Sequence, residues 1–379
     1  MDSDAVNTLP LPEELVERVL AHLAPLPCLD ESAFVEARQQ LVRVAQASEQ
    51  LRRLAGPLLY CHTRFNKHFA DESVFLHPAR AALVRTARLE YETNAAVYYE
   101  DVKTLRHAPH LEEVEVVTPP GGFELDDLVC NVPNLKHLAL LNIDRLVPPP
   151  EDSALHLISL TLQGIRMPQY VAEELLQPLR LPSLAVLTLG YFANLMDQQF
   201  FPQLSPAFLD QLDCLILLPD ACYSDLSPPL PPIHTSTPIL LPYRLSGDFP
   251  VLPFQPGSIA PVHIHCFADL PPPEGQHVHR GADTLVAIKA RISDLSAFAP
   301  AAIWLHPIFH PSHACHERAV EYNPYLSKRS KDVLVACEER GVMVDYYTRE
   351  EEGRSLETAR PPAAFWRYAK ELKRARAGP

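Results

Sequence analysis

The sequence predicts an α/β protein in which a small all-helical module at the N-terminus precedes an elongated array of short parallel strands and helices. Two observations lead to this prediction. An amphipathic helical pattern lies close to the start of the chain, and beyond residue 80 a spacing of apolar residues recurs at intervals of 22 to 28 residues. A chain of 379 residues is also too long for one compact core.

The first predicted element is a short helix over residues 12–23. Pro12 suits its first turn, because a residue there has no use for a backbone N–H group. One stripe of the helix is apolar and carries Leu15, Val16, Val19, Leu20 and Leu23. By periodicity alone, this stripe is also consistent with an ordinary helix that packs into the core of a domain.

The order of residues in this stretch resembles the opening of an F-box, which runs Leu-Pro-x-Glu-Leu-(apolar)-x-x-(Ile/Val)-Leu-x-x-Leu. The matching positions are Leu11, Pro12, Glu14, Leu15, Val16, Val19, Leu20 and Leu23. A second block, residues 41–60, resembles the later helices of an F-box and the Pro-Leu-Leu-Tyr exit that is common in fungal members. We therefore expect an F-box-like helical module over residues 1–65.

This resemblance implies a module that buries its apolar stripe in a Skp-type adaptor and so tethers the chain to the cullin scaffold of a ubiquitin ligase. The adaptor-binding residues it implies are Leu11, Pro12, Leu15, Val16, Val19, Leu20 and Leu23.

The recurring unit in the rest of the chain is (apolar)-x-x-(apolar)-x-(apolar). Its copies are Leu111, Val114, Val116; Leu135, Leu138, Leu140; Leu157, Leu160, Leu162; Leu184, Leu187, Leu189; Leu212, Leu215, Leu217; and, more weakly, Val84, Ala87, Leu89. The alternating apolar pair in each unit fixes a short strand to a core. The period resembles that of leucine-rich repeats, which form a curved solenoid, or horseshoe, with parallel strands on the inner face. An ordinary α/β domain is the alternative.

Helices are expected between strands, most clearly over residues 126–129 and 171–176. Eleven prolines crowd residues 219–261, and because proline cannot donate to a strand ladder we expect an irregular insertion there. Strands are expected again at 262–267, 302–306 and 342–346, with a helix over 317–340. The predicted solenoid thus spans 66–360, and residues 361–379 form a basic capping helix or a tail.

Composition excludes several classes of function. A formal charge of −14 is unsuited to general nucleic-acid binding, and the absence of a long apolar run and of a leader predicts a cytosolic or nuclear protein without a membrane segment. The eight cysteines form no Cys-x-x-Cys pair, so we expect free thiols.

Histidines cluster late in the chain, but without a recognised zinc spacing, so we expect no metal and no other cofactor. No nucleophile elbow or His-Glu-x-x-His motif is present in the sequence, and we expect no catalytic residues and no enzyme.

Strand alternation points a second set of residues away from the core, onto the inner face. These candidate substrate-binding residues are Arg88, Glu113, Glu115, His137, Leu141, Thr161, Gln163, His263, His265, Trp304 and His306. Trp304 is the expected anchor if it is exposed; the alternative is that it packs beneath the proline-rich insertion. The sequence thus predicts a substrate receptor that binds an unknown protein, the alternative being a repeat scaffold or inhibitor with no link to ubiquitin.

Overall fold

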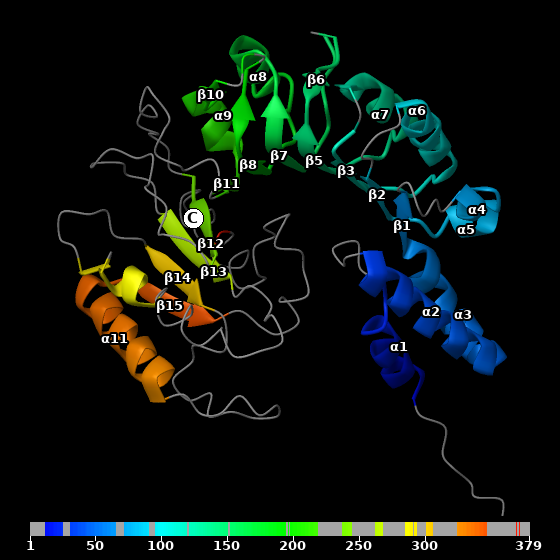
Figure 1. Ribbon diagram of the computed structural model, residues 1–379, viewed down its shortest axis with the longest axis horizontal. Coiled ribbons are helices and arrows are strands. Elements are labelled where there is room, and N and C mark those ends of the chain that lie inside the picture. The colour runs from blue at the N-terminus through cyan, green and yellow to red at the C-terminus, as the bar shows by residue number, and fades with distance from the viewer. Residues whose placement is uncertain are drawn as a thin grey trace, which may run out of the picture.

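The computed structural model describes most of the chain up to residue 218 and shorter stretches beyond it (Figure 1). The described residues are 12–25, 31–65, 72–90, 95–119, 121–150, 152–194, 196, 198–218, 237–244, 262–267, 285–290, 292–293, 301–305, 324–346, 369 and 371. They form a mixed α/β structure around one large, mostly parallel sheet. Figure 1 shows this sheet as an arch with helices along its outer side.

Three helices form the N-terminal unit: α1 (Glu13–Ala21), α2 (Glu31–Ala47) and α3 (Glu49–Cys61). Pro12 directly precedes α1, and the side chain of Ser48 caps α3 by accepting a hydrogen bond of 3.1 Å from the N–H group of Leu51. The helices enclose a core made of Leu20, Leu41, Ala45, Leu54, Ala55 and Leu59. This core is separate from the core under the sheet.

The large sheet holds thirteen strands in the described part of the chain. They are β1 (His62–Phe65), β2 (Thr86–Glu90), β3 (Glu113–Val117), β5 (His137–Ile143), β7 (Ser159–Arg166), β8 (Val186–Leu189), β9 (Phe192–Ala193), β10 (Gln199–Phe200), β11 (Cys214–Leu217), β12 (Ile239–Arg244), β13 (Val262–Phe267), β14 (Ala302–Leu305) and β15 (Met343–Tyr346). Apart from the short β9–β10 hairpin, each strand pairs in parallel with the next one along the chain, in the order β1-β2-β3-β5-β7-β8-β11-β12-β13-β14-β15. A second, two-stranded parallel sheet joins β4 (Gly122–Glu124) to β6 (Arg145–Val147).

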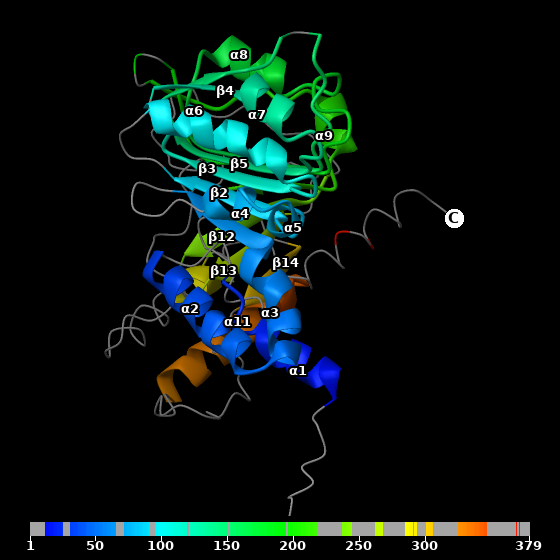
Figure 2. The ribbon, with the colours of Figure 1, turned by 90° about the vertical axis from the view of Figure 1, so that its right-hand side faces the viewer.

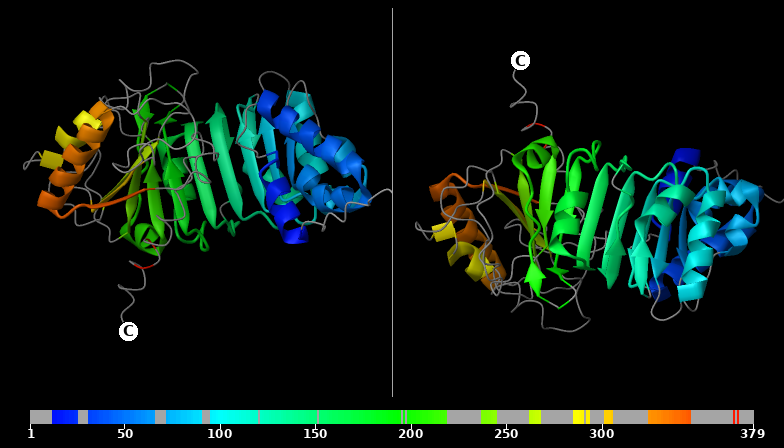
Figure 3. Two further views of the ribbon diagram at one scale, coloured as in Figure 1. Left: turned by 90° about the horizontal axis from the view of Figure 1, so that it is seen from below. Right: turned by 90° about the horizontal axis from the view of Figure 1, so that it is seen from above.

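Parallel pairing requires each connection to cross back over the sheet before the next strand begins. In the N-terminal part the connections contain α4 (Glu72–Phe75), α5 (Pro78–Ala81), α6 (Ala95–Thr104), the 3₁₀ turn η1 (Leu105–His107), α7 (Leu125–Asn131), α8 (Gln169–Leu175) and α9 (Pro206–Gln211). The longer α11 (Pro324–Arg340) precedes β15. Figure 3 shows helices over the outer side of the sheet, with α1–α3 at one end of the array and α11 at the other, and Figure 2 shows α1–α3 below the first strands.

The outer side of the sheet is apolar because the alternating pairs of the recurring unit all point to it. One continuous cluster contains both members of each pair, Val114 with Val116, Leu138 with Leu140, Leu160 with Leu162, Leu187 with Leu189 and Leu215 with Leu217. The strands predicted from these pairs are present as β3, β5, β7, β8 and β11. Burying each pair against the short helices provides the main stabilisation of the array.

The later predictions have a mixed outcome. Strands β13, β14 and β15 and helix α11 coincide with predicted elements, although α11 begins at Pro324. The prediction of an irregular insertion over 219–261 is wrong at residues 239–244, which form β12. Pairing of β12 with β11 is confined to Ile239 and Leu240, so Pro242 lies beyond the end of that ladder and its missing N–H group removes no hydrogen bond from it. Strand β1, which we expected inside the helical module, belongs to the sheet.

Candidate functional site

Helix α1 presents two apolar side chains to solvent. Leu15 is 47% exposed and Val19 is 62% exposed, and because they are four residues apart they lie on the same face of the helix. We call these two residues the α1 patch. Pro12, at the start of the same helix, is also exposed. Large apolar side chains that remain in solvent next to each other are candidates for an interface.

The remaining predicted adaptor-binding residues divide between the core and the edge of the patch. Leu20 is only 3% exposed and packs in the core of the three helices, so the expectation that it contacts an adaptor is wrong for this conformation. Val16 and Leu23 are partly buried against the same core, and Leu11 lies outside the described residues. A single apolar stripe thus serves two purposes, with one edge inward and the other outward.

Two contacts fix the orientation of α1 on the module. Arg53 of α3 donates a hydrogen bond to Glu13 Oε1 at 2.7 Å, which is an exposed ion pair and contributes little energy. The burial of Leu20, a residue of α1, in the core of the three helices contributes more, because it removes a complete leucine side chain from water. The α1 patch is therefore held in a defined position.

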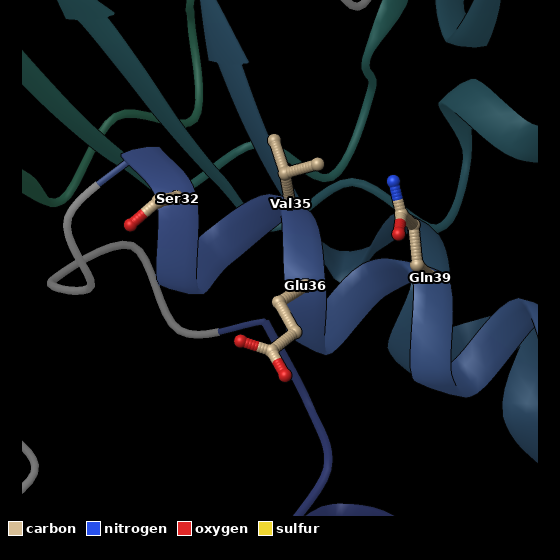
Figure 4. A pocket seen from close by; sticks show the side chains of 4 residues that line it. All are labelled: Ser32, Val35, Glu36 and Gln39. Carbon is tan, nitrogen blue, oxygen red and sulfur yellow. The ribbon is translucent and has the colours of Figure 1, made fainter.

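Helix α2 borders a shallow hollow of about 460 Å³, lined by Ser32, Val35, Glu36 and Gln39. Figure 4 shows that all four side chains come from this one helix. Such a hollow is wide and open, whereas small-molecule sites are enclosed and mostly apolar. It does not define a ligand site.

The inner face of the sheet is organised in rows, because parallel pairing brings equivalent residues side by side. One row runs Arg64, Arg88, Glu115, Ala139, Thr161, Thr188, Ile216, Leu240, His263, Ala302 and Met343. A second row begins His62, Thr86, Glu113, His137, Ser159, Val186 and Cys214. The inner face therefore changes along the array from charged residues on the first strands to small and polar ones, and then to apolar residues at Ile216 and Leu240.

The charged end of the face is buried. Arg88 pairs with Glu115 at 3.0 Å and lies 3.4 Å from Glu90, and Arg64 pairs with Glu90 at 2.5 Å. Phe34 of α2, itself buried, lies under the Arg64 guanidinium at 6.0 Å from ring centroid to Cζ. The predicted substrate residues Arg88 and Glu115 are thus covered and paired within the chain, which contradicts the expectation that they meet a ligand.

The electrostatics of this end follow from the same contacts. Burial by itself raises the pKa of Glu90, but hydrogen bonds and charge from Arg64 and Arg88 outweigh that effect and lower the pKa below its usual value. Glu90 therefore stays ionised at neutral pH and holds the two arginines together.

The middle of the face is half-exposed and polar. His137 Nδ1 lies 2.8 Å from Ser159 Oγ, and burial lowers the pKa of His137 despite the opposing charge of Glu112. Gln163 lies across Gly190 of the connection after β8, since a Cβ atom on that glycine would approach Gln163 Cγ to 2.9 Å. With Glu113 and Thr161, these residues form the accessible inner strip of β3, β5 and β7. Ser159 was missed by the sequence reasoning, although the alternation that selected Thr161 also points Ser159 inward.

The described side chains that β11, Leu240 of β12 and β14 place on the far part of the face are apolar and buried. Trp304 is fully buried in a cluster with Cys214, Ile216, Leu218, Leu240, Ala302 and Ala369. The expectation of an exposed tryptophan anchor is therefore wrong. Ala369 comes from the C-terminal segment, so residues distant in the chain meet the sheet here.

Two of the three late histidines predicted to bind substrate lie on a strand of the sheet. His263 and His265 lie on β13, in register with Ala302 and Trp304 of β14, and their side chains, like all of His306, lie outside the described residues. Within the described ranges no three His, Cys, Asp or Glu side chains come together as a metal-binding group. Residues Cys61, Cys130, Cys214 and Cys337 are free cysteines.

Comparisons with family models, curated proteins and solved structures gave no match to this chain. Among the helices of the described ranges, none has the length and apolar character needed to cross a bilayer.

Proposed function

We propose that the protein is the substrate receptor of a cullin-type ubiquitin ligase, with an F-box-like N-terminal module and a leucine-rich-repeat-like array. The observation that carries the proposal is the α1 patch. Leu15 and Val19 are solvent-exposed at two positions of the F-box-like pattern, on a helix whose opposite edge is already packed. A Skp-type adaptor would bury this patch.

The array supports the receptor part of the proposal. Strands that pair in chain order at a repeat of 22 to 28 residues are typical of leucine-rich repeats. Their inner face is a broad surface, of which the strip with Glu113, His137 and Gln163 remains accessible to a protein substrate. A receptor of this kind accelerates modification by raising the effective concentration of its substrate near the ligase, and needs no catalytic residues of its own.

The decisive experiment is co-purification of the adaptor and cullin with the double variant Leu15→Asp/Val19→Asp. Placing two carboxylates in a desolvated interface is expected to cost about 3 kcal/mol or more, roughly a hundredfold in affinity. Because both side chains are exposed in the free chain, the melting temperature should barely change.

A matched control is Leu179→Asp/Met196→Asp, which introduces the same charges at two apolar residues that are 85% and 82% exposed on the array. This control should retain full adaptor binding. If the wild-type chain fails to capture the adaptor, or if the α1 double variant captures it normally, the ligase assignment is wrong and a repeat scaffold or inhibitor without a link to ubiquitin becomes the better description.

A further inference from the structure

Helix α11 presents charged side chains to solvent that have no ion pair within the described part of the chain. The opposite face of this helix packs into the cluster that contains Val333 and Cys337. On the outward face Val335 is 53% exposed. The charged residues exposed around it are Lys328, Lys331, Glu338 and Glu339. With about 100° of rotation per residue, these five residues lie in one stripe along the helix, which we call the α11 stripe.

The charges of the α11 stripe are separated by sign along the helix. Lys328 and Lys331 lie in its N-terminal half, and Glu338 and Glu339 lie in its last turn. Carboxylates at a helix C-terminus oppose the helix dipole, and like charges three residues apart repel each other. Lys331 and Glu338 are about 10 Å apart along the axis, which is too far for an ion pair within one helix. These charges therefore do not stabilise the isolated helix.

A charge at the border of the stripe shows the contrast. The Asp332 carboxylate lies 3.5 Å from Lys289 Nζ and 3.7 Å from Arg329 Nη1, so it is balanced within the chain. The charges of the stripe point outward instead, where another molecule can reach them.

A second copy of α11 in antiparallel orientation complements this arrangement. A surface that is basic in one half and acidic in the other matches itself after a rotation of 180°. Lys331 and Glu338 lie on one side of Val335, and Lys328 and Glu339 lie on the other. Lys331 therefore faces the partner's Glu338, and Lys328 faces the partner's Glu339. Both pairs place the two-fold axis within one residue of position 334, so a single register satisfies them all.

We propose that α11 is a dimerisation helix, which binds a second copy of this chain in antiparallel orientation through the α11 stripe. One helix face is smaller than the interface of a typical stable complex, so the dimer is weak, with a Kd on the order of 10 μM. Figure 3 shows α11 and α1–α3 at opposite ends of the array, so dimerisation leaves the α1 patch free. The inference goes beyond the proposed function, because it involves neither adaptor nor ubiquitin.

The first test is sedimentation velocity of the full-length chain over a concentration series that reaches about 200 μM, well above the expected Kd. The weight-average sedimentation coefficient should rise with concentration, as it does for a reversible dimer. Raising NaCl from about 50 mM to about 500 mM should lower it again, because salt screens exposed ion pairs. A chain that stays monomeric in low salt, or a dimer that salt does not weaken, refutes the proposal.

The second test reverses single charges. Lys331→Glu turns two attractive contacts of the dimer into two repulsive ones, and Glu338→Lys does the same, so each variant alone should raise the Kd at least about tenfold. An equimolar mixture of the two variants restores opposite charges at both contacts and should dimerise like the wild-type chain. Lys103→Glu, at a lysine of α6 whose side chain is 55% exposed, is the matched control and should leave the Kd unchanged.

The mixture makes this test decisive. Recovery of the dimer requires two folded variants, so a folding defect cannot imitate it. If Lys331→Glu dimerises like the wild-type chain, the interface lies elsewhere, and if the mixture fails to recover, the antiparallel pairing of these charges is wrong. Either outcome overturns the proposal.

The third test examines the register directly. A water-soluble carbodiimide joins a lysine amine to a carboxylate only where the two groups touch, and mixing ¹⁵N-labelled with unlabelled chains identifies links between copies by mass spectrometry. Links from Lys331 to Glu338 and from Lys328 to Glu339 should join a labelled chain to an unlabelled one. A cross-linked dimer that contains neither link refutes the register. Every variant keeps the α1 patch, so failure here and failure of the ligase assignment are distinguishable.

Discussion

The buried charges at the first strands have the clearest energetic consequences of any residues on the inner face. The side chains of Arg88 and Glu115 are 6% and 9% exposed, and removing Glu115 leaves the buried Arg88 guanidinium with one carboxylate partner fewer. Glu115→Ala is expected to lower the free energy of unfolding by about 3 kcal/mol, near the low end for such changes, because Glu90 stays within 3.4 Å of Arg88. Urea denaturation measures this loss.

The double variant Arg88→Met/Glu115→Leu serves as the comparison. It removes both charges and fills the space with apolar groups, so it should lose less stability than Glu115→Ala alone. A larger loss in the double variant would mean that the Arg88–Glu115 ion pair contributes more to the stability of this end of the sheet than apolar side chains in its place do.

The direction of the inner-face side chains was predictable residue by residue, but their burial was not. Alternation along a strand correctly turned Arg88, Glu115 and Trp304 away from the outer core. Phe34 lies against the neighbouring Arg64, and Ala369 shares a buried cluster with Trp304; both are far away in the sequence and carry no strand pattern. A periodicity describes one element only, so it cannot show what another element places on top of it.

At the scale of elements, residues with a left-handed backbone recur at the same register position along three neighbouring strands. Thr118 directly follows β3, Asn142 lies within β5, and Gly164 lies at the equivalent position within β7. All three residues have a left-handed backbone, with φ of 49°, 56° and 64° respectively. At Gly164 a Cβ atom would also come within 3.1 Å of Asn142 Cα. This position therefore combines a conformational and a steric demand for glycine.

Gly164→Ala and Gly341→Ala separate these two demands. Gly341 ends α11 with φ of 66°, and a Cβ atom there would meet no atom within 4 Å. We expect Gly341→Ala to cost about 1 kcal/mol from backbone strain alone and Gly164→Ala about 3 kcal/mol because overpacking is added. Chemical denaturation of both variants measures the difference, and equal losses would contradict the crowding at Gly164.

Strand prediction succeeded where an alternating pair of apolar residues faces a core, and it failed at β12, where a proline suggested that no strand forms. The pairs of β3, β5, β7, β8 and β11 each bury two large side chains, and this constraint is visible in any single unit. Strand β12 was hidden by Pro242, because only the register shows that the ladder to β11 has already ended there.

At the scale of the whole molecule, the described residues form several apolar clusters instead of one core. The outer cluster extends from Phe65 to Ile239, and a distinct cluster of α11 and its neighbours includes Val333, Cys337 and Ile303. The sequence indicated the elongated order through its repeat, yet it could not locate the break between clusters. That break depends on which long-range contacts form beyond residue 239, where the repeat is irregular.

Separate clusters predict local unfolding, because an array in which units contact only their neighbours need not open as a whole. Free thiols report on this directly. Cys337 and Cys214 are buried in different clusters, and burial raises the pKa of Cys337 to about 12, so it reacts with a thiol reagent only after opening. Val333, one helical turn from Cys337, is fully buried beside it.

Val333→Ala should destabilise this cluster by about 2 kcal/mol and accelerate labelling of Cys337 roughly thirtyfold, while labelling of Cys214 stays at its wild-type rate. Mass spectrometry of the labelled peptides separates the two thiols. Leu54→Ala, in the core of the N-terminal helices, is the matched control and should accelerate neither. If Val333→Ala accelerates both cysteines to the same extent, the clusters open together and the molecule behaves as one cooperative unit, since a loss of stability in one part would then be transmitted through the sheet to the other.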